Sequence, residues 1–416
     1  MVLKSKTDIT NHWVLLIIFL FFYCRVIGIF FAAQMWEASQ KPFWGDEKYG
    51  LMTSVREFGY GHMLIHGAQG QGSPAPLDYI VLKVFDQMKE RVGYLGLRPE
   101  VYFRLWANGI TCFSVIFIGL FFGMGIFRNK EGFLIKAAQA FLLLCVPFAY
   151  LFKTQVFYFA AETRPYALWN SMYFVVLGML LFRDQRKPRW ILFGFLVLLS
   201  FSATAVSFQL AAMILAFGLV RYWQERNFRL AVKEGAWLFT LPFIIVVYYC
   251  LKVGQWDTVS AGGTREEFYR LWTHNGTIAP MMLVVMGICF FCEATRKYAL
   301  APLAFLLVYL MGPFIFWMTW LKGFFFAHRQ FIYYDLAVPV FLLTLLKCLP
   351  ACGQSIKSKE MRWVVVVVFC VLGASLTFRG KIVKRFEKAR RQAQGGLASQ
   401  LVPYIREEDD LGLEKG

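Results

Sequence analysis

The chain has 416 residues, of which 58% are hydrophobic and only 17% charged, and its mean hydropathy is +0.51. Soluble proteins carry about 25% charged residues, while disordered chains, collagen-like repeats and disulfide-rich secreted domains need polar, glycine-periodic or cysteine-dense sequences. The composition excludes these classes and predicts a membrane protein. We interpret the net charge of +18 as topology rather than nucleic-acid binding, because cytoplasmic loops of membrane proteins are rich in lysine and arginine.

A membrane-spanning helix needs about 20 mostly apolar residues to cross about 30 Å of hydrocarbon. We therefore predict an all-α polytopic protein with about eleven spans (10 to 12). The candidate spans are 13–33, 107–127, 133–152, 165–182, 190–205, 206–220, 236–254, 277–294, 298–318, 331–347 and 362–378. The run 190–220 is predicted to turn near 202–207, and a single tilted helix is the alternative.

The distribution of lysine and arginine predicts the orientation. If the N-terminus is cytoplasmic, every second loop is strongly basic and the short loops between them carry far fewer cations. This asymmetry follows the positive-inside rule and places the first loop (34–106) and the tail (379–416) outside. We divide the chain into a transmembrane module (1–378) and a short tail, first basic and then acidic. The first span is predicted to remain as an anchor, with Arg25 facing the bundle.

Polar residues concentrate in the predicted exterior loops, which favours a reaction at the outer surface over a lined transport pore. In the first loop, Gly45-Asp46-Glu47 precedes Leu51, Val55 and Phe58, whose spacing is typical of one helix face. Asp46 is expected at a helix N-terminus. There it is either an N-cap or a carboxylate placed to accept a proton from a sugar or lipid hydroxyl.

Later in the same loop, Pro74-Ala75-Pro76-Leu77-Asp78-Tyr79 predicts an extended entry into a second helix. The apolar residues between Ile80 and Val92 fall on one stripe, and lysines and an arginine flank it. A basic amphipathic helix of this kind lies in the membrane interface beside anionic headgroups. The alternative is a helix that packs on the rest of the loop.

Two further stretches place arginine at the predicted outer boundary. Glu162-Thr163-Arg164-Pro165-Tyr166 opens the fourth span, and proline suits the first turn of a helix. Arg164 therefore stands beside a helix N-terminus, an arrangement that binds anions, unless its side chain extends to the lipid headgroups. His328-Arg329 leads into the tenth span, where Asp335 is costly unless it has a partner.

These pieces together resemble the GT-C membrane glycosyltransferases, in the branch of the protein mannosyltransferases and the lipid A aminoarabinose transferase. The matching stretches are Gly45-Asp46-Glu47, Pro74 to Tyr79, Arg104-Leu105-Trp106, Glu162 to Leu168 and Arg329 to Pro339. The resemblance implies an inverting glycosyltransferase that moves a sugar from a polyprenyl-phosphate donor to an envelope glycan, lipid or protein acceptor. Its site would lie on the periplasmic or extracellular side of the inner (plasma) membrane, among membrane lipids and without nucleic acid.

The resemblance also implies roles for individual residues. Asp46 matches the catalytic carboxylate, a general base, and Glu47 would position the acceptor or the donor phosphate. Charge on the leaving phosphate would be stabilised by Arg164, Arg329 and His328. The same motifs supply the predicted substrate-binding residues, which are Pro76, Asp78, Tyr79, Glu162, Tyr166 and Tyr333.

The cysteines argue against a disulfide and a zinc site. None of the nine falls in a predicted exterior loop, so no structural disulfide is expected. Cys289 with Cys292 and Cys348 with Cys352 have metal-like spacing. We predict no metal ligand set here, because each is interpreted as an isolated pair and a structural zinc site uses four ligands. The family resemblance leaves a divalent ion open as a cofactor.

Two other classes of protein remain as alternatives. In a lipid or polysaccharide transporter or flippase, Asp46 and Arg164 would only guide anionic headgroups. In a non-catalytic scaffold of an envelope-glycan complex, the same residues would have no chemistry. Sugar consumption separates the first hypothesis from both alternatives.

Overall fold

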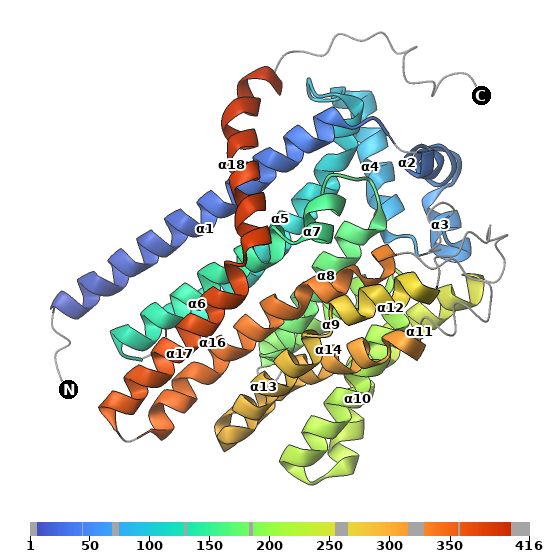
Figure 1. The fold of residues 1–416 in the computed structure, drawn as a ribbon. Coiled ribbons are helices and arrows are strands. Elements are labelled where there is room, and N and C mark those ends of the chain that lie inside the picture. Colours follow the sequence, from blue (N-terminus) through green and yellow to red (C-terminus); the bar gives the residue numbers. More distant parts are fainter. Residues whose placement is uncertain are drawn as a thin grey trace.

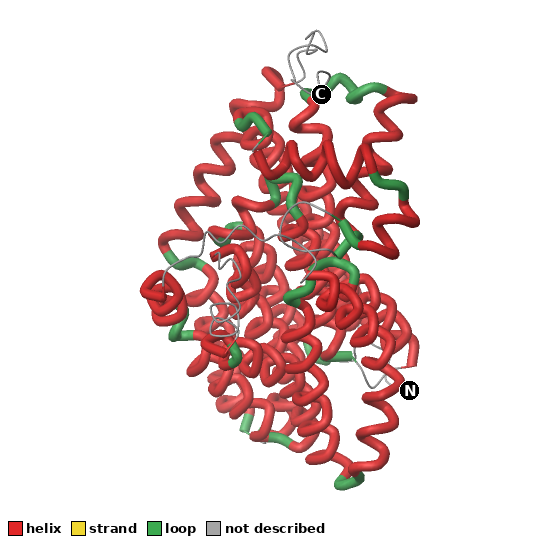
Figure 2. The backbone as a smooth tube through the Cα atoms, turned by 90° about the vertical axis from the view of Figure 1, so that its right-hand side faces the viewer, coloured by secondary structure: helices red, strands yellow, loops and turns green. Residues whose placement is uncertain are grey.

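A computed structural model describes residues 6–43, 45–68, 75–128, 131–182, 186–253, 265–314, 328–356 and 358–400. All regular structure within these ranges is helical, and they contain no strand (Figure 2). Nine stretches of the described chain are long and apolar enough to cross a membrane. The prediction of an all-α, multi-pass membrane protein is confirmed at this level.

A described helix lies at each of the eleven predicted spans. They are α1 (Lys6–Gln40), α5 (Pro99–Arg128), α6 (Phe133–Leu151), α8 (Pro165–Leu180), α9 (Arg186–Ser200), α10 (Val206–Glu225), α11 (Phe228–Val253), α13 (Ile278–Phe291), α14 (Leu300–Leu310), α16 (Ala337–Ser355) and α17 (Lys359–Thr377). Helices α8 and α9, with 16 and 15 residues, are too short to be among the nine. Helices α13 and α14 are among them because each continues from the helix before it, over Phe268–Phe291 and Glu293–Phe314. The run 190–220 is two helices, because α9 ends at Ser200 and α10 begins at Val206.

The remaining elements are mostly helices of the predicted exterior segments. They are α2 (Gly45–Gly50), the π-helix η1 (Leu51–Glu57), α3 (Tyr60–His66), α4 (Leu77–Val92), α7 (Thr154–Phe159), α12 (Arg265–His274), the 3₁₀ helices η2 (Glu293–Ala299) and η3 (His328–Leu336), and α18 (Gly380–Gln400). Figure 1 shows α2, α3, α4, α7 and α18 near the C-terminal end of α1. Connections such as those after α5 and α16 lie at the opposite end, where the Gln354 side chain donates to Glu131 at 2.8 Å. One end of the bundle therefore carries the predicted exterior material.

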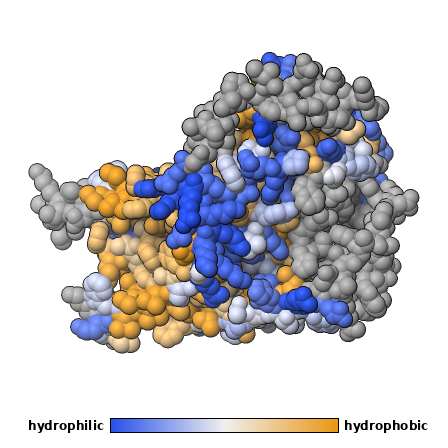
Figure 3. All heavy atoms as spheres, turned by 45° about the horizontal axis from the view of Figure 1, so that its top comes forward, coloured by the Kyte–Doolittle hydropathy of each residue, from blue (hydrophilic) through white to orange (hydrophobic). Residues whose placement is uncertain are grey.

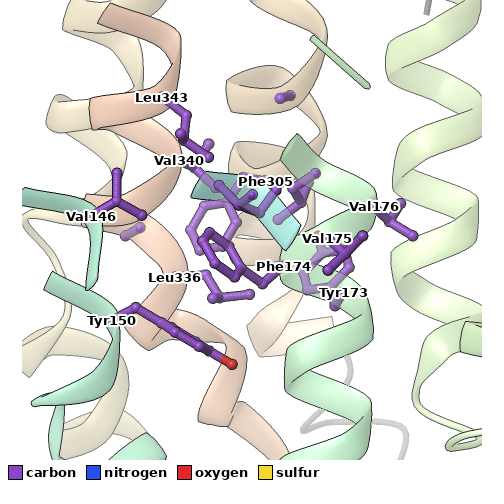
Figure 4. Close-up of a cluster of buried hydrophobic side chains, with 14 of the residues drawn as sticks. Val146, Tyr150, Tyr173, Phe174, Val175, Val176, Phe305, Leu336, Val340 and Leu343 are labelled. Atoms are coloured by element: carbon purple, nitrogen blue, oxygen red, sulfur yellow. The ribbon is translucent and has the colours of Figure 1, made fainter. Parts of the chain in front are cut away.

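Helix α8 lies at the centre of the bundle. Every residue of it is buried, which is the property of a helix that is apolar all round. Figure 4 shows its side chains packed among residues of α6, α14, η3 and α16; the labelled ones are Val146, Tyr150, Tyr173, Phe174, Val175, Val176, Phe305, Leu336, Val340 and Leu343. This central position holds the N-terminus of α8, with Arg164 before it, between the outer elements.

Large apolar side chains remain exposed on the outside of the bundle. On α1, Trp13, Ile17 and Phe21 are 57 to 64% exposed, as expected of a surface that faces lipid rather than water. Arg25 is also exposed, so the expectation that it faces the bundle is wrong. The buried stripe of α1 includes Tyr23, Val26 and Phe30, and the helical period leaves position 25 off that stripe.

The first loop builds a small core of its own on the outer turns of α5. Leu51 and Val55 of η1 pack there with Leu82 of α4 and with Tyr102 and Phe103 of α5. The helix predicted from Leu51, Val55 and Phe58 is confirmed as far as Glu57, and Phe58 is extended. The hydroxyls of two tyrosines in α11, Tyr248 and Tyr249, donate to backbone carbonyls of α3. The loop is thus fixed to the membrane helices at both sides.

Helix α4 packs on the rest of the loop with one face and exposes an apolar stripe on another. Its Tyr79 and Leu82 are buried against the loop, while Val84, Met88 and Val92, one helical face, are 42 to 52% exposed. The packing face and the exposed apolar stripe therefore coexist on one helix.

Candidate functional site

Arg104 makes the most contacts at the end of the bundle that carries the predicted exterior segments, which we call the outer end. Its side chain, in the second turn of α5, is 1% exposed. Its guanidinium donates to the backbone carbonyls of Ala38, Lys41 and Pro42 at 2.9, 2.6 and 3.0 Å and to the carboxylate of Glu47 at 2.7 Å through Nη2 and 3.3 Å through Nε. It closes the end of α1, whose last carbonyls have no partner within the helix, and holds the first turn of α2.

Glu47 connects Arg104 to the segment before α8. Its Oε1 accepts hydrogen bonds from the Thr163 amide at 2.7 Å and from the Thr163 hydroxyl at 3.0 Å, and the carboxylate is almost fully buried. We call Glu47, Arg104 and Thr163 the buried polar cluster. It joins three stretches that are far apart in the sequence, each of which carries one of the recognised motifs. The Glu47 carboxylate is therefore bound by Arg104 and Thr163.

The catalytic candidate Asp46 is the residue before Glu47, in the first turn of α2. Its backbone position is therefore fixed by the bonds of its neighbour to Arg104 and Thr163. The side chain of Asp46 lies outside the described residues, as do the side chains of His328 and Arg329 at the start of η3.

Glu162 and Arg164 are the residues immediately before and after Thr163. Both are buried, and Arg164 Nε lies 3.4 Å from Glu162 Oε2. Burial raises the pKa of the Glu162 carboxyl, and the nearby Glu47 carboxylate adds to that effect, whereas Arg164 and Tyr158 oppose it. Pro165 begins α8, as predicted. Arg164 thus stands at a helix N-terminus as a buried cation and does not extend to the headgroups.

The remaining motif of the first loop joins the same region through Trp106. The Trp106 indole N–H, one turn or less from Arg104, donates to Asp78 Oδ1 at 3.0 Å. Pro76 is buried just before α4, and Tyr79 is buried in the small core of the loop. The structure places these three predicted substrate-binding residues in packing positions next to the cluster.

Asp78 should make stability depend on pH. Burial raises the pKa of its carboxyl to about 7, although the Trp106 hydrogen bond favours the charged form. The folded protein therefore holds a proton there more tightly than the unfolded chain, and stability is expected to fall as pH rises from about 4 to about 7. At about 1.36 kcal/mol per pKa unit, the difference between pH 5 and pH 8 is on the order of 2 kcal/mol. Asp78→Asn should flatten this dependence and raise the melting temperature at pH 8.

The measurement is thermal unfolding of the purified protein in neutral detergent at several pH values. Asp86→Asn is the matched control, because Asp86 lies on the same helix but has a cationic partner, Lys89, at 3.1 Å. That control should retain the pH dependence of wild type. Equal pH profiles for Asp78→Asn and wild type would remove Asp78 as the cause.

The late motif is brought to the same end by η3. Tyr333 lies against Trp169 and Tyr173 of α8, with ring centroids 6.0 and 6.2 Å apart, and Tyr166 packs on Phe159. Asp335 has the partner that its position in a span requires, since its Oδ2 accepts from the Gln155 backbone amide at 3.1 Å.

A cavity opens beside the buried polar cluster. Its volume is about 450 Å³, and its lining comes from the end of α1, from α7 and from α18; the residues are Glu37, Lys41, Thr154, Gln155, Phe157, Tyr158, Phe159, Arg385 and Lys388. We call it the tail cavity. Sequence reasoning missed its polar residues. Ile382, Phe386 and Ala389, at spacings of four and three, are the signal that could have predicted α18 and the side chains it presents.

The two cysteine pairs are not isolated from each other, contrary to what the sequence suggested. Cys289 of α13 and Cys348 of α16 face each other with their sulfurs 3.6 Å apart, so the structure brings Cys289-Cys292 and Cys348-Cys352 together at the basic end of the bundle. The interpretation failed because the pairing arises from helix packing. Within the described ranges, no three histidine, cysteine or acidic residues are arranged to hold a metal ion.

No protein-family model and no curated protein matches the sequence. Function must therefore be inferred from the residues and their geometry.

Proposed function

We propose that this protein is an inverting glycosyltransferase that transfers one sugar from a polyprenyl-phosphate donor to an acceptor at the outer face of the plasma membrane. One observation carries the proposal. The buried polar cluster joins the Gly45-Asp46-Glu47, Arg104-Leu105-Trp106 and Glu162-Thr163-Arg164 stretches directly, through the contacts of Glu47 with Arg104 and Thr163. These are the motifs on which the family resemblance rests.

In the proposed reaction, the acceptor hydroxyl oxygen attacks the anomeric carbon from the face opposite the donor phosphate. The bond between that carbon and the phosphate oxygen breaks, and the configuration inverts. Asp46 accepts the proton of the hydroxyl as general base. The phosphate diester leaves as a monoester and gains negative charge, which a preorganised cation stabilises. Arg164 is our first choice for that cation, with Arg329 and His328 as further candidates.

The buried polar cluster serves this chemistry by positioning. Glu47 fixes the first turn of α2, and therefore the backbone of Asp46, relative to Thr163 and Arg164. Glu162 pairs with Arg164 and orients it. A charged group held by buried partners needs no reorganisation as the transition state forms, which is why such sites are effective. The isoprenoid tail of the donor would lie in the membrane, against the apolar surface of the helices.

The test is reconstitution of the purified protein in vesicles with a panel of polyprenyl-phosphate sugars and a membrane extract as acceptor source. We expect release of free polyprenyl phosphate together with a labelled acceptor. The transporter alternative predicts movement of a fluorescent lipid between leaflets without consumption of any sugar donor. That second result, with no donor consumed across the panel, would overturn the proposal.

A further inference from the structure

The tail cavity is cationic and is built from both ends of the chain. Lys41 follows α1, while Arg385 and Lys388 come from α18, and Glu37 is the one carboxylate among the described lining residues. Figure 1 shows α18 crossing the C-terminal part of α1. In Figure 3, hydrophilic side chains gather in the middle of this face, beside a broad apolar surface. Cations beside exposed apolar surface suit a ligand that carries both an anionic headgroup and an apolar tail.

Helix α18 is seated firmly enough to form a fixed wall. Its Ile382 and Ala389 are buried, and Phe386 packs on Phe148 and Phe152 with ring centroids 5.0 and 5.3 Å apart. The Arg385 guanidinium donates to the Phe152 carbonyl at 3.0 Å. A guanidinium held in this way loses little further freedom when it binds an anion.

The lysines that line the cavity have only weak interactions that would compete with a bound anion. Lys388 Nζ lies 2.8 Å from Glu37 Oε1 with its side chain 61% exposed, and exposed ion pairs contribute little. Lys41 Nζ stands 4.5 Å above the Tyr158 ring, a contact that leaves its N–H groups available to an anion. Asp335 interacts electrostatically with Arg385, and its carboxylate also accepts a hydrogen bond from the Gln155 backbone amide. Among the described residues that line the cavity, three cations thus stand against one carboxylate, that of Glu37.

The α7 side of the cavity also offers a neutral acceptor. Within the described residues, Gln155 Oε1 is buried and has no hydrogen-bond partner, although Gln155 lines the cavity. A buried amide oxygen without a donor is costly, and a ligand hydroxyl would satisfy it. Tyr158 and Phe157 supply aromatic surface beside it. Cations, one free acceptor and aromatic rings together fit a phosphate attached to a group that bears hydroxyls.

We propose that the tail cavity binds the phosphate of a lipid-linked phosphate, with Arg385, Lys388 and Lys41 on its oxygens. Its volume of about 450 Å³ lies within the usual range of about 300–1,000 Å³ for ligand sites. The Lys41 carbonyl bonds Arg104, and the cavity-lining Tyr158 lies next to Glu162, so the cavity adjoins the buried polar cluster. As the donor subsite of the transferase, the cavity depends on the proposed function; as a binding site it does not.

The experiment measures equilibrium binding of farnesyl phosphate to the purified full-length protein in neutral detergent. Wild type should bind it more tightly than farnesol and more tightly than inorganic phosphate. The double variant Arg385→Gln with Lys388→Gln should lose about tenfold or more in affinity, because two charge-assisted contacts are removed. The matched control, Lys384→Gln with Arg391→Gln, removes two exposed cations of the same helix that do not line the cavity, and it should stay within about twofold.

Lys41→Gln provides a second variant that leaves α18 unchanged, and it should weaken binding in the same direction. Equal losses in the α18 double variant and its control would overturn the proposal, as would no loss in either. Inorganic phosphate binding as well as farnesyl phosphate would overturn the lipid-borne part. Binding without any sugar transfer would remove the proposed function and leave this site. If the double variant transfers sugar with an unchanged KM for the donor, the cavity is not the donor subsite, and the proposed function remains.

Discussion

Replacement of Arg104 by methionine is expected to cause the largest loss of stability of any single change at the outer end of the bundle. The variant leaves the Glu47 carboxylate buried without its cation, and it leaves three carbonyls in and just after the last turn of α1 without this donor. Breaking a buried ion pair from one side costs about 3–5 kcal/mol, a large part of the about 5–15 kcal/mol that stabilises a typical protein. We expect little folded protein in the membrane and a much lower melting temperature in detergent.

Arg98→Gln is the matched control for that variant. Arg98 also donates to a carbonyl at the end of α1, that of Ser39 at 2.9 Å, but it does so at the surface. It should cost no more than about 1 kcal/mol. A double change, Glu47→Gln with Arg104→Met, should be less harmful than the sum of the two single changes, because neither then strands a buried charge. An Arg104→Met protein as stable as wild type would contradict the role of the cluster.

Asp46→Asn is expected to have the largest effect on sugar transfer. Loss of a general base typically reduces the rate by about 10²–10⁴-fold, while the change from carboxylate to amide preserves volume. Abundance in the membrane and melting temperature should therefore match wild type. The reconstituted assay, read as release of polyprenyl phosphate, measures the rate.

Glu57→Gln is the matched control, since Glu57 is an exposed carboxylate at the end of η1 in the same loop. Its rate should equal that of wild type. An Asp46→Asn protein that transfers sugar at the normal rate would exclude Asp46 from the mechanism, and the buried polar cluster would then have only a structural role.

Much of the helical pattern could be predicted because hydrophobicity is a local property. The turn between α9 and α10 followed from the serines and the threonine near 202–207, which interrupt an apolar run. Which side chains of a helix point into the bundle could not be predicted in the same way. Arg25 was expected to face inward because a charge in lipid is costly, yet the stripe that α1 buries is determined by its contacts with α5, α6 and α18.

The contacts of the candidate site are not local, and this limits what the sequence alone can predict about them. Glu47, Arg104 and Thr163 each lie at least 57 residues from the next, and no periodicity relates them. Only the family resemblance grouped their motifs, and it gave no sign that Glu47 would bind Arg104. The cysteine pairs on α13 and α16 met for the same reason, through helix packing.

The most direct test of the central claim is mass spectrometry of envelope glycolipids and glycoproteins from cells with and without this protein. A glycosyltransferase acting at this site predicts that one class of envelope molecule lacks a single sugar when the protein is absent. Wild-type protein should restore that sugar, and the Asp46→Asn variant should not. Identical glycan profiles with and without the protein, or full restoration by Asp46→Asn, would contradict the account.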